Sequence, residues 1–390
     1  MMLGYLLARA GIAVTVLEKH ADFLRDFRGD TVHPSTLSVL QQCGLLERFN
    51  AIPQFRIRQA AVNIAGEKIP VADFSRLRPF GYMALVPQWD FLNLLAEAAA
   101  ELPAFQLLRE HEVTELIREG EQVVGVRAAT GGGTLDLRAE LVVACDGRDS
   151  VVRGALGLEL RDLGAPMDAL WFRLPRQASD PGELEAILGA GQMMVMINRD
   201  RYWQLAYVVP KGGISELREQ PISEFRRRIA SLAPHLGPRC DAISSWDEVK
   251  SLVVGVNHLR RWHAPGVLLI GDAAHTMSPI GGVGVNLAIQ DAVAAARLLA
   301  EALHADRPLD ARLLARLQRR REWPTRMMQG LQGLAQKRVV SSTLERSDRP
   351  PRIPALVRWL LGFGWIRAIP ARIIGHGFRR EQVDTQLFRR

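Results

Sequence analysis

The chain has 390 residues, of which 48% are hydrophobic and 24% are charged, so it can bury a large core and has ordinary globular composition. This composition argues against a mainly disordered chain. Three widely spaced cysteines, Cys43, Cys145 and Cys240, argue against a disulfide framework or a zinc site and fit a reducing, cytoplasmic setting. The net charge of +8 is uneven: residues 316–390 hold 17 Arg and Lys against 5 Asp and Glu, which leaves the preceding residues at −4.

Residues 1–20, MMLGYLLARAGIAVTVLEKH, predict a helix that ends at Gly11 and then a buried strand that carries Glu18 at its end. Further predicted elements follow in chain order: a helix from Pro34 to Gly44, a hairpin around AGEK in residues 55–74, a helix over 88–102, short strands over 111–137, and a strand that ends at Asp146 and Gly147. This part of the chain is typical of mixed β and α structure with a small antiparallel insertion.

The sequence changes character over residues 155–260, where WFRLP, MMVMI and RYWQLAYVVP are strand-like and rich in Trp and Met, which predicts a separate sheet. Residues 266–303 return to an apolar strand, a Gly-rich loop and a long helix. We expect an α/β fold with these parts: one domain from 1–160 and 255–305, with 55–85 contributing to the substrate side, a substrate-domain sheet over 161–254, and a helical, Arg-rich region over 306–390.

Two acidic residues stand at strand ends that suit a nucleotide. A strand that follows a helix and ends in an acid, as at Glu18, is typical of dinucleotide-binding units, in which the carboxylate accepts hydrogen bonds from the ribose hydroxyls. In VLLIGDAAHTMSPIGGVGVNLAIQDA an apolar strand ends at Asp272, and glycines then open a helix near Val285. Backbone N–H groups and the positive end of a helix dipole would face a ligand there.

Four blocks of the sequence resemble, in the same order, the motifs of one family. GDAAHTMSPIGGVGVNLAIQDA resembles the second flavin-binding motif of the group A FAD-dependent monooxygenases, the p-hydroxybenzoate hydroxylase-like aromatic hydroxylases. CDGRDSVVR is similar to their middle motif, whose Asp-Gly turn serves FAD and the nicotinamide donor. RGDTVHPSTLSVLQQCGL and VPQWDFLNLL are similar to the segments whose Arg and Gln approach the flavin. The resemblance covers most of the first 305 residues.

This resemblance implies a Rossmann-like FAD-binding domain intergrown with a mixed or antiparallel substrate sheet. It assigns the cofactor contacts as follows: Glu18 to the adenosine ribose, Arg28 to the pyrophosphate and ribityl chain, Gln88 to the flavin, the backbone at Val113 to the adenine, Asp146 to the turn and the cofactor, Asp272 to the ribityl hydroxyls, and Pro279, Gly281, Gly282, Gly284, Val285 and Asn286 to the isoalloxazine ring. No catalytic side chain and no metal ligand is expected, because the flavin carries the chemistry. His275 is expected to pack and hydrogen-bond rather than to act as a base.

The same resemblance implies that the first flavin motif is incomplete in this chain. The motif consists of a strand, GxGxxG and a helix, and Gly4, Gly11 and Glu18 match only its later part. Roughly ten to fifteen residues of strand and phosphate-binding turn are therefore expected to be missing. We expect a chain without them to bind FAD poorly, because that turn supplies the N–H groups that neutralise the pyrophosphate.

The family's chemistry implies that NAD(P)H reduces FAD, that O2 adds at the flavin C4a carbon, and that the hydroperoxide hydroxylates an aromatic or polyketide-like small molecule. Trp171, Met194, Met196 and Trp203 offer ring and thioether surface for such a substrate. It is equally open that they belong to a core, because successive residues of a strand face opposite sides of its sheet.

The function and the basic tail each allow a second interpretation. The chain could be an FAD-dependent reductase of the same fold, or a truncated, non-catalytic remnant. The tail mixes Leu, Ile and Trp with spaced Arg, which fits either an amphipathic element on an anionic membrane surface or a helix pair that covers the core. No nucleic-acid module accompanies the charge. A homodimer is left open.

Overall fold

The computed structural model describes residues 1–24, 31–180, 184–199, 201–345, 349–351 and 353–386. As the sequence predicts, the chain begins with helix α1 (Met2–Arg9), a turn in which Gly11 has a φ of +76°, and strand β1 (Val14–Glu18). Gly4 allows α1 to lie against β1, since a Cβ at this position would come within 2.6 Å of the Val16 side chain.

The side of the fold that is expected to bind the nucleotide is built on short parallel strands. β1 pairs with β7 (Phe105–Arg109), and β11 (Val142–Ala144) pairs with β20 (Val267–Leu269), which also carries antiparallel β19 (His263–Ala264). Within the described part of the chain, no strand pairs with the other edge of β1 or of β11. The amine of Met1 lies within electrostatic reach of Glu18 and Cys145, and burial lowers the pKa of this amine. The ends of β1 and β11 are therefore close to one another.

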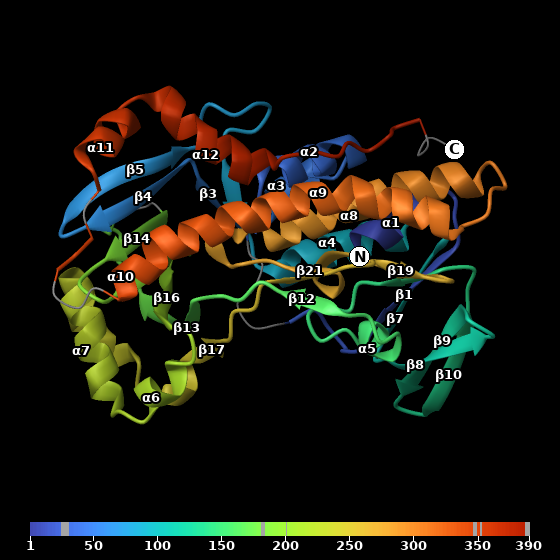
Figure 1. Cartoon of the computed structure of the whole chain (residues 1–390), viewed down its shortest axis with the longest axis horizontal. Helices are drawn as coiled ribbons and strands as arrows, with labels where there is room; N and C mark the ends of the chain where they lie inside the picture. The colour runs from blue at the N-terminus through green and yellow to red at the C-terminus, as the bar shows by residue number, and fades with distance from the viewer. Residues whose placement is uncertain (25–30, 181–183, 200, 346–348, 352, 387–390) are drawn as a thin grey trace.

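Helices cover these strands, and their apolar faces form the largest core of the protein (Figure 1). They are α2 (Pro34–Cys43), α3 (Leu46–Ala51), α4 (Gln88–Ala100), α8 (Gly284–Leu303) and the long α9 (Ala311–Ala335). The stretch Ile280–Leu303 is long and apolar enough to cross a membrane, but 78% of its most apolar window is buried inside the protein. This stretch is therefore placed as the core helix of a globular domain would be.

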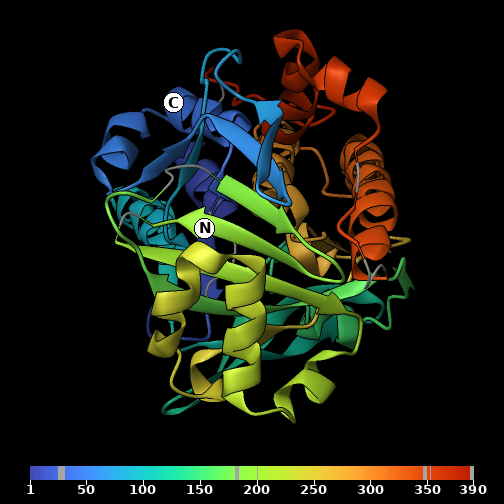
Figure 2. The same ribbon diagram turned by 90° about the vertical axis from the view of Figure 1, so that its left-hand side faces the viewer.

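A seven-stranded, mainly antiparallel sheet forms the second part of the molecule. Its strands, in spatial order, are β17 (Lys250–Leu252), β13 (Met167–Pro175), β16 (Tyr202–Pro210), β15 (Met193–Asn198), β14 (Leu184–Leu188), β4 (Gln59–Ile64) and β5 (Glu67–Asp73). Helices α6 (Ile214–Arg218) and α7 (Ile222–Leu232) lie against one face of this sheet, in yellow in front of the green strands in Figure 2. The opposite face is directed toward the glycine loop before α8, because its apolar residues pack against Ile280.

The remaining elements connect these two parts. The antiparallel insertion consists of β8 (Glu112–Glu119), β9 (Gln122–Thr130) and β10 (Gly133–Arg138), followed by α5 (Val151–Ala155). Two small sheets are built from β2 (Thr31–Val32), β6 (Met83–Leu85) and β3 (Phe55–Ile57), and from β12 (Leu160–Asp162), β18 (Asn257–Leu259) and β21 (His275–Thr276). The chain ends with a π-helical turn (Gln336–Ser341), α10 (Ser342–Leu344), α11 (Ala355–Leu361) and α12 (Gly364–His376). The predicted α/β class, with an antiparallel sheet and a helical C-terminal region, is confirmed.

Candidate functional site

Asp272 stands where strand β20 gives way to helix α8. The backbone turns sharply at Gly271, which has a φ of +60°. The Asp272 side chain is one-third exposed, and its Oδ2 accepts a hydrogen bond from Arg148 Nε over 3.3 Å. Its Oδ1 lies 4.0 Å from the position of a Cβ on Gly284, at the first turn of α8. No side chain caps this helix, so its first N–H groups and its positive dipole end adjoin the carboxylate.

The glycine loop before α8 is held by a short strand from far away in the sequence. Gly281 and Gly282 have φ values of +77° and +60°, and a Cβ on Gly282 would lie 2.1 Å from Thr31 Oγ1. Thr31 Oγ1 donates to the carbonyl of Gly282 over 2.9 Å. The Asn286 side-chain amide donates to the carbonyls of both Thr31 and Gly282. Strand β2 therefore fixes the shape of the loop, and only glycine fits at position 282.

His33 extends this contact to helix α12. The Asn286 Oδ1 accepts a hydrogen bond from the His33 backbone N–H over 2.9 Å. The His33 ring is wholly buried, and its Nδ1–H donates to the carbonyl of Ile374 over 2.8 Å. Burial lowers the pKa of His33 to about 4, although hydrogen bonds to the backbone of Ile374 and Gly281 oppose the shift. The imidazole is therefore neutral at physiological pH.

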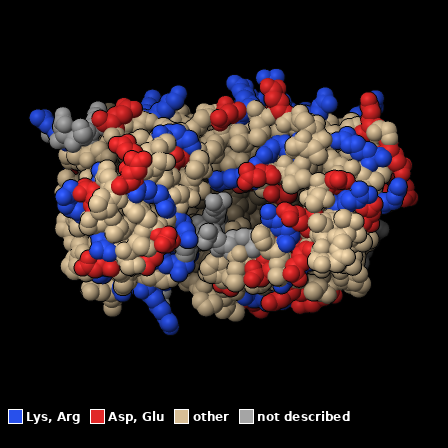
Figure 3. All heavy atoms as spheres, turned by 90° about the horizontal axis from the view of Figure 1, so that it is seen from below, with Lys and Arg blue, Asp and Glu red and all other residues tan. Residues whose placement is uncertain are grey.

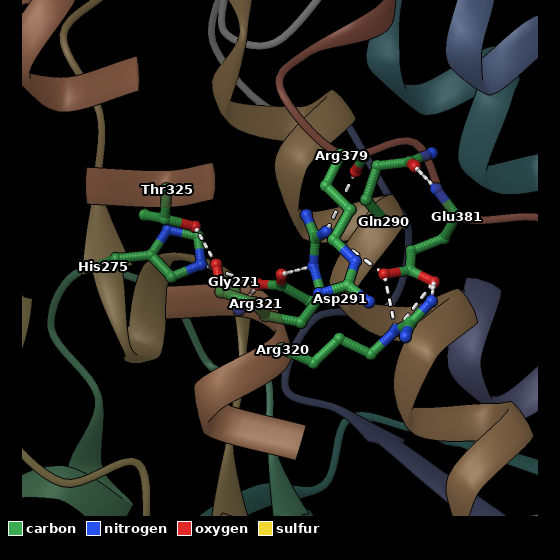
Figure 4. Close-up of polar contacts among 9 residues, drawn as sticks. All are labelled: Gly271, His275, Gln290, Asp291, Arg320, Arg321, Thr325, Arg379 and Glu381. Carbon is green, nitrogen blue, oxygen red and sulfur yellow. Dashed lines mark hydrogen bonds and ion pairs between the residues drawn. The ribbon is translucent and has the colours of Figure 1, made fainter. Parts of the chain in front are cut away.

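A cluster of buried charged residues stabilises the turn that carries Asp272 (Figure 4). Asp291 Oδ2 accepts hydrogen bonds from the Gly271 backbone N–H over 3.2 Å and from His275 Nε2 over 2.6 Å. Its Oδ1 accepts from Arg321 Nε over 2.9 Å. Burial alone would raise the pKa of Asp291, but His275 and Arg321 outweigh it and lower this pKa. Asp291 is therefore ionised, and it holds both sides of the turn that carries Asp272.

The same cluster holds the C-terminal segment against α8 and α9. Glu381, which is 2% exposed, forms an ion pair with Arg320 at 2.7 Å and another with Arg321 at 3.4 Å. The Gln290 side-chain carbonyl accepts from the Glu381 backbone N–H. Figure 4 shows these groups meeting between the two helices. His275 thus has the structural role expected from the sequence, since its ring is 1% exposed and bound to Asp291.

The residues assigned to the adenosine half lie at the ends of the parallel strands. Glu18 ends β1, and its Oε1 accepts a hydrogen bond from the backbone N–H of His20 over 2.9 Å. Asp146 follows β11, and its Oδ2 accepts from the backbone N–H of Val152 over 3.3 Å. The other assigned positions are Gln88 as the first residue of α4 and Val113 in β8, paired with Ala128, while Arg28 lies outside the described residues.

A hollow separates the two parts of the molecule. Figure 3 shows the surface hollowed between the region of α6 and α7 and the region of β8 to β10, with acidic and basic side chains around the hollow.

The strand register shows which residues of the large sheet face the glycine loop. Trp171, Ala206, Val195, Ala186 and Val62 are successive cross-strand partners, so they form one row on one face. This is the face whose cluster of Met167, Leu188, Met193 and Val208 packs against Ile280. The row is apolar, with two small alanines between larger side chains. It offers a shallow apolar surface opposite the loop.

Three of the four residues expected in the substrate pocket lie on the other face. Met194, Met196 and Trp203 are each at most 2% exposed, in the core with Phe225 and Ile229 of α7. The prediction that these three line the pocket is corrected: they are core residues. The reason is the period of two along a strand, since a strand that is apolar on both faces does not reveal in its sequence which face is the core.

Comparison with known proteins agrees with this geometry. A family model described as an FAD binding domain matches residues 1–330. The chain is also 32% identical over 393 residues to a 6-methylpretetramide 4-monooxygenase from Streptomyces rimosus, which covers 99% of this chain and 92% of that relative. The chain belongs to the FAD-dependent aromatic monooxygenases.

Two further comparisons concern the length of chain that is matched and the fold that is shared. The present chain is 30% identical over 311 residues to a rifampicin monooxygenase from Streptomyces venezuelae, and the match covers 75% of this chain but only 60% of that relative. The crystal structure of a probable FAD-dependent monooxygenase from Pseudomonas aeruginosa has a TM-score of 0.75 and 24% identity, over 88% of this chain and 93% of the other. The latter similarity shows a shared fold.

The residues at the flavin end of this monooxygenase fit FAD. The first turn of α8 is uncapped, Asp272 is partly exposed beside it, and Gly281 leaves its backbone open, since the nearest atom to a Cβ there is 3.7 Å away. Uncapped N–H groups suit the carbonyl-rich edge of an isoalloxazine, and a carboxylate suits the ribityl hydroxyls.

Several residues that shape this site were not predicted from the sequence. Thr31, His33 and Asp291 contact the loop directly. Thr31 and His33 lie in the block RGDTVHPSTLSVLQQCGL, of which only the Arg was assigned to the flavin, and Asp291 lies in a predicted long helix. Asp291 carried a usable signal, since it is the one acid in the mainly apolar run NLAIQDAVAAARLL. Arg321 gave no such signal, because it stands in a helix rich in arginine.

Proposed function

We propose that this monooxygenase uses FAD, NAD(P)H and O2 to hydroxylate a flat aromatic or polyketide-like molecule. One observation carries the proposal: the loop that follows Asp272 faces the apolar row of the large sheet that includes Trp171 and Val195. A planar substrate bound on that row would lie opposite the uncapped start of α8. The similarity to a 6-methylpretetramide monooxygenase supports a polycyclic substrate.

The side chains of the protein would bind and orient, while the bound flavin supplies the oxygen-transfer chemistry. Asp272 would hold the ribityl hydroxyls, and Glu18 would hold the adenosine ribose. The backbone from Gly281 to Asn286 would face the ring, where the helix dipole favours electron-rich groups. Ile280 and the apolar sheet face would exclude water from the reacting atoms, which limits the wasteful release of hydrogen peroxide.

An oxygen-labelling experiment tests this function. The purified chain, equilibrated with FAD, is mixed with NADH or NADPH and a panel of polycyclic phenols under 18O2. We expect substrate-dependent oxidation of the nicotinamide and a product that carries one labelled oxygen atom. Reduction of the substrate without incorporation of oxygen would establish a reductase instead. Failure to bind FAD at micromolar concentration would establish a non-catalytic protein.

A further inference from the structure

The helices α11 and α12 carry a row of exposed apolar side chains on the outside of the molecule. The exposed fractions are 66% for Leu356, 43% for Val357, 62% for Trp359, 39% for Phe363, 63% for Trp365 and 50% for Ile369. We call these six residues the aromatic ridge. The three aromatic rings are continuous, with centroids 4.9 Å apart from Trp359 to Phe363 and 6.5 Å apart from Phe363 to Trp365. Helix α11 buries none of its residues.

The aromatic ridge lies within a segment in which every charged side chain is positive. From residue 349 to residue 380 the sequence contains seven arginines and no Asp or Glu. On α12, the exposed Trp365, Ile369 and Arg372 are spaced by four and three residues, so they share one helix face. The opposite face of α12 is the packed one, where Ala371 and Gly375 are buried. Apolar and cationic groups are therefore displayed together on the outer face.

We propose that the aromatic ridge docks this protein on an anionic membrane surface. Indole rings and leucine side chains favour the boundary between headgroups and acyl chains, and arginines beside them pair with lipid phosphates. Helix α11 lies beside β5, where Arg358 forms an exposed ion pair with Glu67. Figure 1 shows α11 and α12 at the edge of the molecule, away from α6 and from β8 to β10, so a flat surface can approach the ridge.

The aromatic ridge and the glycine loop of the candidate site lie on different sides of α12. The inner face of α12 contacts the glycine loop, since the Ile374 side chain lies 3.7 Å from the position of a Cβ on Gly281. A bilayer on the outer face of α12 would therefore be about one helix diameter, ~10 Å, from that loop. The proposal does not depend on the reaction that occurs there.

Vesicle co-sedimentation of the whole chain tests the proposal. We expect binding to phosphatidylcholine vesicles that contain phosphatidylglycerol, with a blue shift of tryptophan emission, and much weaker binding to phosphatidylcholine alone. The double variant Trp359→Ala/Trp365→Ala is expected to bind at least about tenfold more weakly. Arg372→Gln is expected to bind the anionic vesicles about fivefold more weakly, in line with one arginine at a charged surface.

Trp323→Ala is the matched control, because Trp323 is 52% exposed on α9, outside the ridge. It should bind vesicles as the wild type does. The proposal is overturned if the wild type does not sediment with anionic vesicles, or if Trp323→Ala loses as much binding as the ridge variant. It is also overturned if the ridge variant converts a dimer to a monomer while the wild type ignores vesicles, since a second copy would then cover the ridge.

Discussion

Asp291 and Asp272 lie on opposite sides of one short turn, and they differ in burial and in the contacts of their carboxylates. Asp291 is wholly buried and contacts His275, Arg321 and the backbone of Gly271. Asp272, in the same turn as Gly271, is one-third exposed and contacts Arg148 through a single hydrogen bond of 3.3 Å. A buried carboxylate is stable only when its charge and its hydrogen-bonding capacity are matched. An exposed one keeps capacity for a ligand.

This difference distinguishes the buried part of the site, which fixes the shape of the loop, from the exposed part, which is available to bind the cofactor. The buried cluster joins α8, α9 and the C-terminal segment, so changes there should alter stability first. The open side of the turn has few protein contacts to lose, so changes there should alter the affinity for the cofactor first. The following substitutions can break or sharpen this contrast.

The largest effect is expected for Arg321→Met. This change leaves the carboxylates of Asp291 and Glu381 buried without their shared cation, which costs about 3–5 kcal/mol of unfolding free energy. Urea denaturation monitored by circular dichroism measures it. Arg138→Gln serves as the control and should cause no measurable change, because the Arg138–Glu119 pair is exposed.

A second substitution tests whether buried charge is the cause. The double variant Arg321→Met/Asp291→Asn should be more stable than Arg321→Met alone, because it removes the charge of one of the two buried carboxylates that lose Arg321. If the double variant is the less stable of the two, the loss comes from packing around Arg321, and the contrast drawn between the two aspartates is wrong.

The next largest effect is expected at the glycine loop, where Thr31 packs against Gly282. Gly282→Ala introduces a Cβ that would meet Thr31 at 2.1 Å and also imposes a left-handed backbone on alanine, with a cost of about 3 kcal/mol in total. Gly281→Ala has the same backbone strain and no close contact, so about 1 kcal/mol is expected. Thermal unfolding of the two variants measures the difference. Equal losses would show that the contact with Thr31 relaxes freely.

The sequence predicted the parts of this site that have local signals. The helix and strand that lead to Glu18, and the strand, loop and helix around Asp272, each follow from contiguous apolar spacing and glycines. The buried cluster could not be predicted in this way, because Glu381 and Asp291 are 90 residues apart and meet only in the packed fold. The sequence also did not show which face of the strands near Met194 packs against α7, since both faces are apolar.

A smaller effect, on the pH dependence of stability, is expected at His33. The folded pKa of about 4 lies below the ordinary value of 6.5, so the unfolded chain binds the proton more readily. The contribution of His33 to stability is therefore complete above pH 6.5 and decreases as the pH falls toward 4. Between pH 7.5 and pH 5.0 it should decrease by about 2 kcal/mol.

Denaturation of the wild type and of His33→Asn at both pH values measures this contribution. The variant should lose about 2 kcal/mol less than the wild type on acidification, whatever its absolute stability. His20→Gln, at an exposed position, should show the pH dependence of the wild type. An unchanged pH dependence in His33→Asn would mean that His33 is already protonated in the folded protein, or that it is not buried.

The smallest effect is expected at Asp272, and it should appear in cofactor affinity rather than in stability. Asp272→Asn keeps the shape of the side chain and removes the charge that strengthens hydrogen bonds to hydroxyl groups, so FAD should bind about tenfold more weakly. The unfolding free energy should change little, because this carboxylate has one long hydrogen bond to lose. Titration of FAD fluorescence with wild type, Asp272→Asn and Arg148→Gln measures the affinities. Arg148→Gln should weaken binding less, since it leaves the carboxylate in place. A variant Asp272→Asn that binds FAD normally but unfolds easily would place Asp272 with Asp291 as a structural residue.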